Sequence, residues 1–242
     1  MFISSINNDF VKETAKLKEK KYRDLTNTFL IEGEHLVKEA SKNNLIKTII
    51  VLEDFPYETN LNKVIVTKEV MKKLSDNPSI PRIMAIVSKK ENTKIGNKII
   101  ILDRLQDPGN LGTIIRSATA FNFDTLILSE DTVDLYNPKV IRSTQGMLFN
   151  INIKRCNIKE LIVNLKEKDY LILGTKVDGG VDVRDYSVNK KFAFIIGNEG
   201  QGISSDILDL CEDYLYIKMN NKCESLNAGV AASILMYELG GK

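Results

Sequence analysis

The sequence predicts an α/β protein made of two parts, a smaller N-terminal αβ unit and a larger C-terminal unit built on a parallel sheet. Short apolar segments alternate with helical patterns along the chain, and the alternation is strongest after residue 97. Such alternation is typical of a parallel sheet covered by helices on both faces. The polar segment Lys89–Asn97 indicates a linker, so we expect residues 1–92 and 97–242 to form the two domains.

The N-terminal unit is expected to begin with one helix over Asn8–Arg23. Its basic residues recur at nearly helical spacing, which would place them on one face: Lys12, Lys16, Lys20 and Arg23. The β-branched run Ile46–Leu52 predicts a buried strand. The remaining elements are strands at Thr28–Ile31, Lys63–Val66 and Ile83–Ser88 and helices at Gly33–Lys42 and Lys68–Leu74.

The C-terminal unit has the more regular succession of strands and helices. Strands are predicted at Lys98–Leu102, Thr125–Leu128, Ile151–Lys154, Tyr170–Gly174, Phe192–Ile196 and Tyr214–Lys218. Helices are predicted at Asn110–Phe121, Pro138–Thr144, Lys159–Glu167, Ser205–Leu210 and Leu226–Leu239. Open α/β sheets bind ligands beyond the carboxyl ends of their strands, so the loops at that edge are the candidates for function.

Composition excludes several classes of protein. The 242 residues are 43% hydrophobic and 27% charged, which is ordinary for a globular protein. The first ten residues lack the apolar core of a signal peptide, and no apolar run approaches membrane-spanning length, so we expect a cytoplasmic protein without a membrane partner. Three scattered cysteines and a single histidine, His35, disfavour a zinc site and Ser-His-Asp chemistry, and we expect no metal.

Charge is distributed unevenly along the chain. The net charge is +2, with +4 in residues 1–95 and −2 in the remainder. A basic N-terminal part could contact the phosphates of a nucleic acid. On charge alone, however, ordinary solvation of the surface is the favoured interpretation.

The first loop that could carry chemistry lies in Asp103–Ala118. Its turn Asp107-Pro108-Gly109 follows a strand, and Asn110 is expected to be the N-cap of the next helix. Arg116 shares a helix face with Gly112 and should lean back toward the carboxyl edge of the sheet. An N-cap followed by a solvated arginine is the equally plausible structural interpretation.

Two further loops show glycine or small residues next to polar ones. Ile195–Ser204 has three glycines within six residues between a strand and a helix, with Glu199 in the turn; the order differs from the dinucleotide-binding fingerprint. In Tyr216–Leu239, the polar residues Ser225 and Asn227 open the last helix. The small residues of that helix are best explained by close packing against another helix.

Taken together, the three loops resemble the three sequence motifs of the SpoU (TrmH) family of RNA 2′-O-ribose methyltransferases, in the family's order. The segment TFLIEGEHLVKEA resembles the ribosomal-protein-like, RNA-binding domain attached to many members. The resemblance implies a SPOUT-type parallel-sheet domain with a C-terminal trefoil knot. It also implies S-adenosylmethionine as methyl donor, a homodimer whose active site takes residues from both subunits, and an RNA substrate, ribosomal RNA first and transfer RNA second.

The family's functional residues can be carried over to positions of this chain. Catalytic positions are Arg116, Asn110, Glu199, Ser225 and Asn227. The cofactor is expected at Gly174, Thr175, Gly197, Ile217, Met219 and Leu226. Arg116 would activate the ribose hydroxyl, stabilise the developing alkoxide or clamp the adjacent phosphate. Weaker candidates for RNA contact are Arg142, Lys47 and the basic face of the first helix.

Two other functions remain possible from the residues. One is a small-molecule enzyme on an ordinary doubly wound nucleotide-binding fold, although a dehydrogenase would carry its glycine loop after the first strand and an acidic residue about 20 positions later. The other is an RNA-binding protein that kept the fold without catalysis. The intact Arg116, Glu199 and Asn227 disfavour this second alternative.

Overall fold

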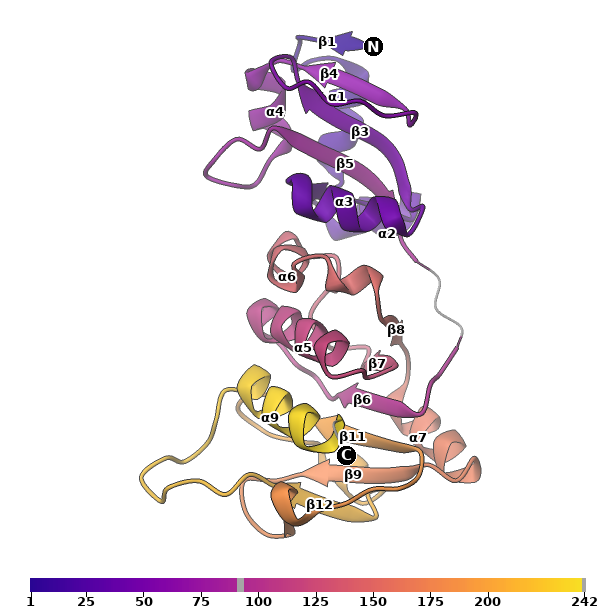
Figure 1. The fold of residues 1–242 in the computed structure, drawn as a ribbon, viewed down its shortest axis with the longest axis vertical. Coiled ribbons are helices and arrows are strands. Elements are labelled where there is room, and N and C mark those ends of the chain that lie inside the picture. Colours follow the sequence, from indigo (N-terminus) through magenta and orange to yellow (C-terminus); the bar gives the residue numbers. More distant parts are fainter. Residues whose placement is uncertain (91–93, 241–242) are drawn as a thin grey trace. The chain divides into compact units, whose positions relative to one another are not determined.

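The computed structural model describes residues 1–90 and 94–240, and it groups them into two compact units (Figure 1). The first unit combines residues 1–91 with 134–149, and the second combines 92–133 with 150–242. Within the predicted linker Lys89–Asn97, residues 91–93 lie outside the described part of the chain. The described linker residues on either side form neither helix nor strand.

A five-stranded mixed sheet forms the centre of the first unit. Its strand order is β1 (Phe2–Ile3), β4 (Lys63–Val66), β3 (Ile46–Leu52), β5 (Ile83–Ser88) and β2 (Thr28–Glu32). β1, β4 and β3 are parallel, whereas β5 runs antiparallel to both β3 and β2. The helices are α1 (Asp9–Lys16), α2 (Lys20–Thr26), α3 (Glu34–Lys42), α4 (Lys68–Leu74) and α6 (Pro138–Thr144), with the 3-10 turn η1 (Met147–Phe149).

The predicted single helix over Asn8–Arg23 is wrong. The chain forms α1 and α2 instead, separated by Leu17, Lys18 and Glu19. Arg23 stabilises the break, because its guanidinium turns inward and donates hydrogen bonds to the carbonyls of Leu17 (2.9 Å) and Lys18 (2.6 Å). Its side chain is only 5% exposed and forms an ion pair with Asp134. Arg23 therefore does not belong to an exposed basic face, while Lys12 and Lys20 are exposed.

The segment 134–149 packs on the sheet of the first unit through aromatic side chains. The ring centroid of Phe29 on β2 lies 4.6 Å from that of Tyr136 and 6.3 Å from that of Phe149. Nε2 of His35 lies 3.0 Å from the Gln145 carbonyl oxygen. Arg142 in α6 is half-buried, with Nη1 enclosed and lacking a partner among the described residues. Lys47 is exposed.

A seven-stranded parallel sheet forms the centre of the second unit. Its order is β10 (Val181–Asp182), β12 (Asp213–Tyr216), β9 (Leu171–Thr175), β11 (Phe192–Ile196), β6 (Lys98–Leu102), β7 (Thr125–Leu128) and β8 (Asn152–Arg155). Every neighbouring pair is parallel. The helices are α5 (Pro108–Ala120), α7 (Ile158–Glu167), α8 (Ser205–Leu208) and α9 (Ala228–Gly240), with a 3-10 turn, η2 (Val183–Asp185).

Helices cover both faces of this sheet, as predicted. On one face, Ile162 of α7 and Ile207 of α8 pack into the cluster formed by Ile99, Ile101 and Ile195. On the other face lie α5 and α9, which pack against each other (Figure 1). Strands that are buried on both faces are continuous apolar runs in the sequence, so the pattern predicted them well. β7 and β11, for example, begin and end at the predicted residues. The predicted fold class is confirmed. Within the described residues, no helix combines the length and apolar character needed to cross a bilayer.

Candidate active site

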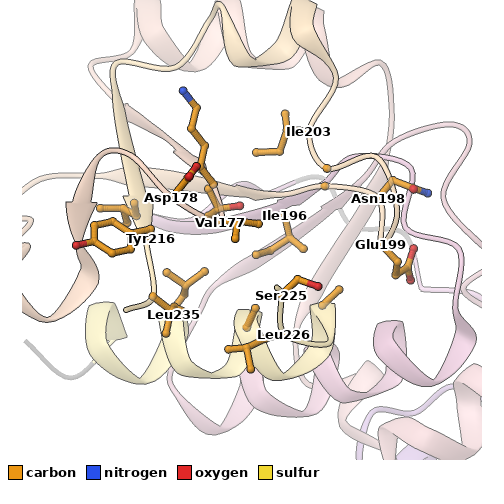
Figure 2. A pocket seen from close by; sticks show the side chains of 18 of the residues that line it. Val177, Asp178, Ile196, Asn198, Glu199, Ile203, Tyr216, Ser225, Leu226 and Leu235 are labelled. Atoms are coloured by element: carbon orange, nitrogen blue, oxygen red, sulfur yellow. The ribbon is translucent and has the colours of Figure 1, made fainter. Parts of the chain in front are cut away.

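A cavity of about 580 Å³ opens at the carboxyl ends of β9, β11 and β12 in the second unit. Its lining comes from residues 175–178, 196–203 and 215–217, together with Leu208, Met219, Ser225, Leu226 and the α9 residues Ala228, Ala231 and Leu235. In Figure 2, Val177, Asp178 and Tyr216 lie at one end of the cavity, and Asn198 and Glu199 at the other. Its volume suits a small-molecule ligand, and its place suits the carboxyl edge of an α/β sheet.

The glycine-rich loop after β11 is tightly closed. Asn198 and Gly202 exchange two backbone hydrogen bonds (3.0 and 2.9 Å). The Asn198 carboxamide oxygen also accepts from the backbone N–H groups of Gly200 (3.0 Å) and Gln201 (3.1 Å). A Cβ on Gly197 would lie 2.1 Å from the carbonyl carbon of Gly202, so no side chain fits there. The close approach of its two arms therefore requires glycine at position 197, while Asn198 and Glu199 contribute side chains to the cavity lining (Figure 2).

Glu199 joins the glycine-rich loop to the loop before α5. Its carboxylate accepts hydrogen bonds from the backbone N–H of Asp107 (2.9 Å) and of Gln106 (3.1 Å), and from the Asn110 side chain (3.0 Å). Burial acts to raise the pKa of Glu199, but these hydrogen bonds outweigh it and hold the pKa below its ordinary value. The ionised carboxylate is therefore the form that stabilises the junction of the two loops.

Asn110 is not the N-cap of α5, contrary to the prediction. Asp107 is the N-cap: its side chain accepts from the Asn110 backbone N–H (2.8 Å), and Pro108 occupies the first helical position. This arrangement follows the usual preference for proline in the first turn, where no partner for its missing N–H is needed. The Asn110 side chain is consequently free to reach Glu199, and Asn110 is 7% exposed.

At the third loop, Asn227 is the residue that starts α9. Its side-chain oxygen accepts from the backbone N–H groups of Gly229 (3.0 Å) and Val230 (3.2 Å), so the helix begins at Ala228 rather than at Leu226. Asn227 itself does not line the cavity, whereas Ser225 and Leu226 do.

The small residues of α9 serve its packing on α5, as the structural interpretation predicted. A Cβ on Gly229 would lie 3.3 Å from Thr113 of α5, closer than most such contacts. Ser233 and Ser117 form a hydrogen bond between the two helices (2.8 Å). Close packing on α5 therefore fixes the position of α9, and with it the Ser225–Leu226 wall of the cavity.

Five of the six predicted cofactor residues line the cavity: Thr175, Gly197, Ile217, Met219 and Leu226. Gly174 does not, because it is buried behind the wall. A Cβ there would meet the Tyr214 ring at 2.8 Å and the Cys211 sulfur at 3.1 Å, so packing explains this glycine. Sequence reasoning missed Lys176, Val177, Asp178 and Tyr216, although their position at or just past the carboxyl ends of strands was a usable signal.

Arg116 lies apart from the other candidates within one chain. It is exposed on α5, it does not line the cavity, and no hydrogen bond or ion pair joins it to another described residue. The neighbouring surface of α9 exposes two large side chains, Val230 (46%) and Tyr237 (65%). Among the described residues, histidine, cysteine and acidic side chains do not form a group of three that could hold a metal ion.

Comparison with known proteins assigns each part of the chain to the kind of domain that its sequence motifs suggest. Residues 97–237 match the SpoU rRNA methylase family, and residues 8–85 match the MRM3-like substrate binding domain. The chain is 36% identical to the 23S rRNA (guanosine(2553)-2′-O)-methyltransferase RlmP of Bacillus subtilis over 99% of both sequences.

Solved structures agree with this match. An AdoMet-bound rRNA methyltransferase from Sinorhizobium meliloti superimposes with a TM-score of 0.87 at 27% identity, covering 98% of this chain and 96% of that one. The SpoU methyltransferase AviRb from Streptomyces viridochromogenes, in complex with AdoMet, shares the fold with a TM-score of 0.87 at 24% identity, covering 96% and 97%. The family match covers well over half of the residues, and the chain belongs to the SpoU rRNA methylase family.

Proposed function

We propose that this chain transfers a methyl group from S-adenosylmethionine to a ribose 2′-hydroxyl of RNA, and that ribosomal RNA is its substrate. The observation that carries the proposal is the convergence of the three loops. Glu199 binds the loop before α5, and Gly197 shares one cavity with Ser225 and Leu226. The 23S rRNA methyltransferase activity of the B. subtilis relative, which matches over nearly its whole length, supports the choice of substrate. An RNA substrate of this kind accords with a cytoplasmic enzyme.

The cavity fits a nucleoside-sized cofactor. Its volume lies in the range of ligand pockets, and its lining combines apolar side chains with a few polar ones, such as Thr175 and Asn198. We assign Thr175, Gly197, Ile217, Met219 and Leu226 to holding the cofactor. S-adenosylmethionine supplies a methyl group on a positively charged sulfur, which is a good leaving group. The protein then has to position the ribose oxygen, and positioning alone can contribute about 7–11 kcal/mol.

Arg116 is assigned to the ribose oxygen. A guanidinium stays protonated in proteins, so it would stabilise the negative charge that develops on the 2′-oxygen, or hold the adjacent phosphate, rather than act as a literal base; the hydroxyl proton would then pass to water. Asn110 and Glu199 are assigned to holding the loop in front of α5, and Ser225 and Asn227 to shaping the wall at the start of α9.

A homodimer would bring Arg116 to a cavity. Within one chain Arg116 does not line the cavity, and the nearby surface of α9 exposes Val230 and Tyr237. Exposed apolar side chains beside a polar one are typical of a subunit interface. We propose that two copies pair through this α5–α9 surface, so that Arg116 of one copy serves the cavity of the other.

The test is transfer of a tritiated methyl group to purified RNA. We expect incorporation into 23S rRNA transcripts that survives alkaline hydrolysis as a resistant dinucleotide, because 2′-O-methylation blocks cleavage at that ribose. Arg116→Ala should abolish transfer while calorimetry still detects cofactor binding. Incorporation into transfer RNA alone would change the substrate assignment. Wild-type protein that binds RNA and never methylates it would refute the enzyme assignment.

A further inference from the structure

We propose that Arg155 is a positioning residue for methyl transfer: its guanidinium fixes the loop 129–133, and that loop fixes the segment 102–107 in front of α5. The inference rests on the proposed function and extends it to a residue outside the three motifs and outside the cavity. It depends on three successive layers of hydrogen bonds, all within the second unit.

The first layer joins Arg155 to the loop after β7. Arg155 ends β8, and its Nη1 donates to the carbonyls of Ser129 (2.7 Å), Glu130 (2.8 Å) and Thr132 (2.6 Å). Its Nη2 donates to the carbonyl of Val133 (2.7 Å). One guanidinium thus donates hydrogen bonds to four carbonyl groups within the loop 129–133. Hydrogen bonds from a charged donor are shorter and stronger than neutral ones, so this set is a firm anchor.

The second layer joins the loop 129–133 to the segment after β6. The Val133 backbone N–H donates to the Leu105 carbonyl (2.9 Å), and the Gln106 side chain donates to the Asp131 carbonyl (2.8 Å). Ser129 contributes twice: its backbone N–H donates to the Leu102 carbonyl (3.0 Å), and its hydroxyl accepts from the Arg104 backbone N–H (2.9 Å).

The hydrogen bonds of the second layer restrain an unusual backbone conformation at Arg104. Its φ angle is +58°, in the left-handed region that few residues other than glycine adopt. Such a conformation persists only when the surroundings determine it, and here the loop 129–133 supplies part of that restraint. Loss of the loop's anchor would let the segment relax.

The third layer is the junction at Glu199. The segment 102–107 presents the backbone N–H groups of Gln106 and Asp107 to that carboxylate and carries the N-cap of α5. A shift of the segment would therefore move both the glycine-rich loop and the start of the helix that carries Arg116. Since Arg155 acts through the loop and does not itself line the cavity, its loss should affect turnover more than cofactor binding.

The experiment compares Arg155→Met and Arg155→Lys with Lys154→Met, a control that removes one exposed positive charge from the same strand. We expect Arg155→Met to lower kcat by about ten- to hundred-fold, the cost of a small misplacement at a reacting centre. Its KM for RNA and the salt dependence of RNA binding should stay near the wild-type values, and the Kd for cofactor should change much less than kcat. Arg155→Lys should recover part of the activity, and Lys154→Met should be normal.

Two outcomes would overturn the proposal. Normal kcat in Arg155→Met is one. The other is a raised KM for RNA with normal kcat and a shallower salt dependence, which would make Arg155 a phosphate contact.

Hydrogen exchange of the folded Arg155→Lys variant gives a second measurement that needs no activity. Amides of residues 102–107 should exchange faster than in the wild type, while those of α7 stay protected; unchanged exchange at 102–107 would refute the proposal. If the wild type methylates no RNA, the proposed function fails, yet the exchange result still tests the role of Arg155.

Discussion

Glu199 shows how a single carboxylate can join two loops that are about ninety residues apart in sequence. Its partners are two backbone N–H groups and the Asn110 side chain. All three are hydrogen-bond donors, so the ionised carboxylate binds them better than the protonated one would. Because its pKa is lower in the folded protein than its ordinary value of 4.5, the ionised group stabilises the fold at every pH above that value. The stabilisation is lost as the pH falls through the lowered, folded-state pKa.

The substitution Glu199→Gln should therefore destabilise the protein most near neutral pH. A glutamine can accept at one oxygen only, and it leaves one backbone N–H of the junction without its acceptor. We expect the melting temperature of the variant to lie below that of the wild type at about pH 7, with the difference shrinking as the pH falls below the ordinary value of 4.5 and through the lowered pKa of the folded state. A difference that stays constant over this range would contradict the role assigned to the charge.

The family resemblance predicted which residues lie at the cavity better than it predicted their hydrogen-bond partners. Glu199, Gly197, Ser225 and Leu226 were expected near the site, and the structure places them around or beside one cavity. Asn110 was expected to cap a helix because asparagine commonly does, yet Asp107 takes that place and Asn110 turns to Glu199. Two adequate caps within four residues cannot be distinguished by propensity alone.

At the scale of elements, buried strands were the most predictable part of the fold. Ile99, Ile101 and Ile195 belong to runs of apolar residues that only a strand buried on both faces explains. The break between α1 and α2 was not predictable, because an arginine in a basic stripe is normally solvated and Arg23 is instead enclosed. The missed strands β1 and β10 are two residues long, too short for any periodicity.

The cap of α5 should matter for activity as well as for stability. Asp107→Ala removes the cap and should destabilise the protein by about 1 kcal/mol, within the usual range for N-caps. Asn157→Ala is a matched control, because Asn157 caps α7 in the same way, with hydrogen bonds of 3.0 and 3.3 Å, on a helix remote from the cavity lining. Chemical denaturation should give similar losses for both variants. Only Asp107→Ala should also lower kcat for methyl transfer, and an equal effect on activity would contradict this view.

The ion pair between Arg23 and Asp134 should be a strong stabilising contact of the first unit. Asp134→Ala leaves a guanidinium whose side chain is 5% exposed without its counter-charge, at a cost of about 3 kcal/mol. Lys20→Ala provides the contrast, since the pair of Lys20 with Asp24 is solvent-exposed and should contribute a few tenths of a kcal/mol at most. Urea denaturation of the full chain measures both. Similar losses in the two variants would show that Arg23 finds enough compensation in the carbonyls of Leu17 and Lys18.

At the scale of the whole molecule, the sequence predicted two parts but not how the chain divides between them. The helix Pro138–Thr144 was predicted with its correct bounds, yet residues 134–149 pack with the N-terminal unit rather than with the sequence around them. The reason is physical: a local pattern specifies an amphipathic helix but not which partner buries its apolar face. Strand order and register also do not show whether one segment of the chain passes through a loop formed by another. The trefoil knot implied by the family resemblance therefore stays a prediction.

The assignment of Arg116 to the opposite subunit has a direct test in mixed dimers. Arg116→Ala removes the guanidinium, and Gly197→Ala places a Cβ 2.1 Å from backbone in the glycine-rich loop, which should block cofactor binding. Each variant alone should be inactive.

If the guanidinium of one copy serves the cavity of the other, a mixed dimer contains one intact site, made of the cavity of the Arg116→Ala copy and Arg116 of the Gly197→Ala copy. Unfolding and refolding an equal mixture should then restore about a quarter of the wild-type activity, because half of the dimers are mixed and each has one site of two. If both residues act within one copy, no mixed dimer has an intact site, and the mixture should stay inactive although size-exclusion chromatography shows that dimers form.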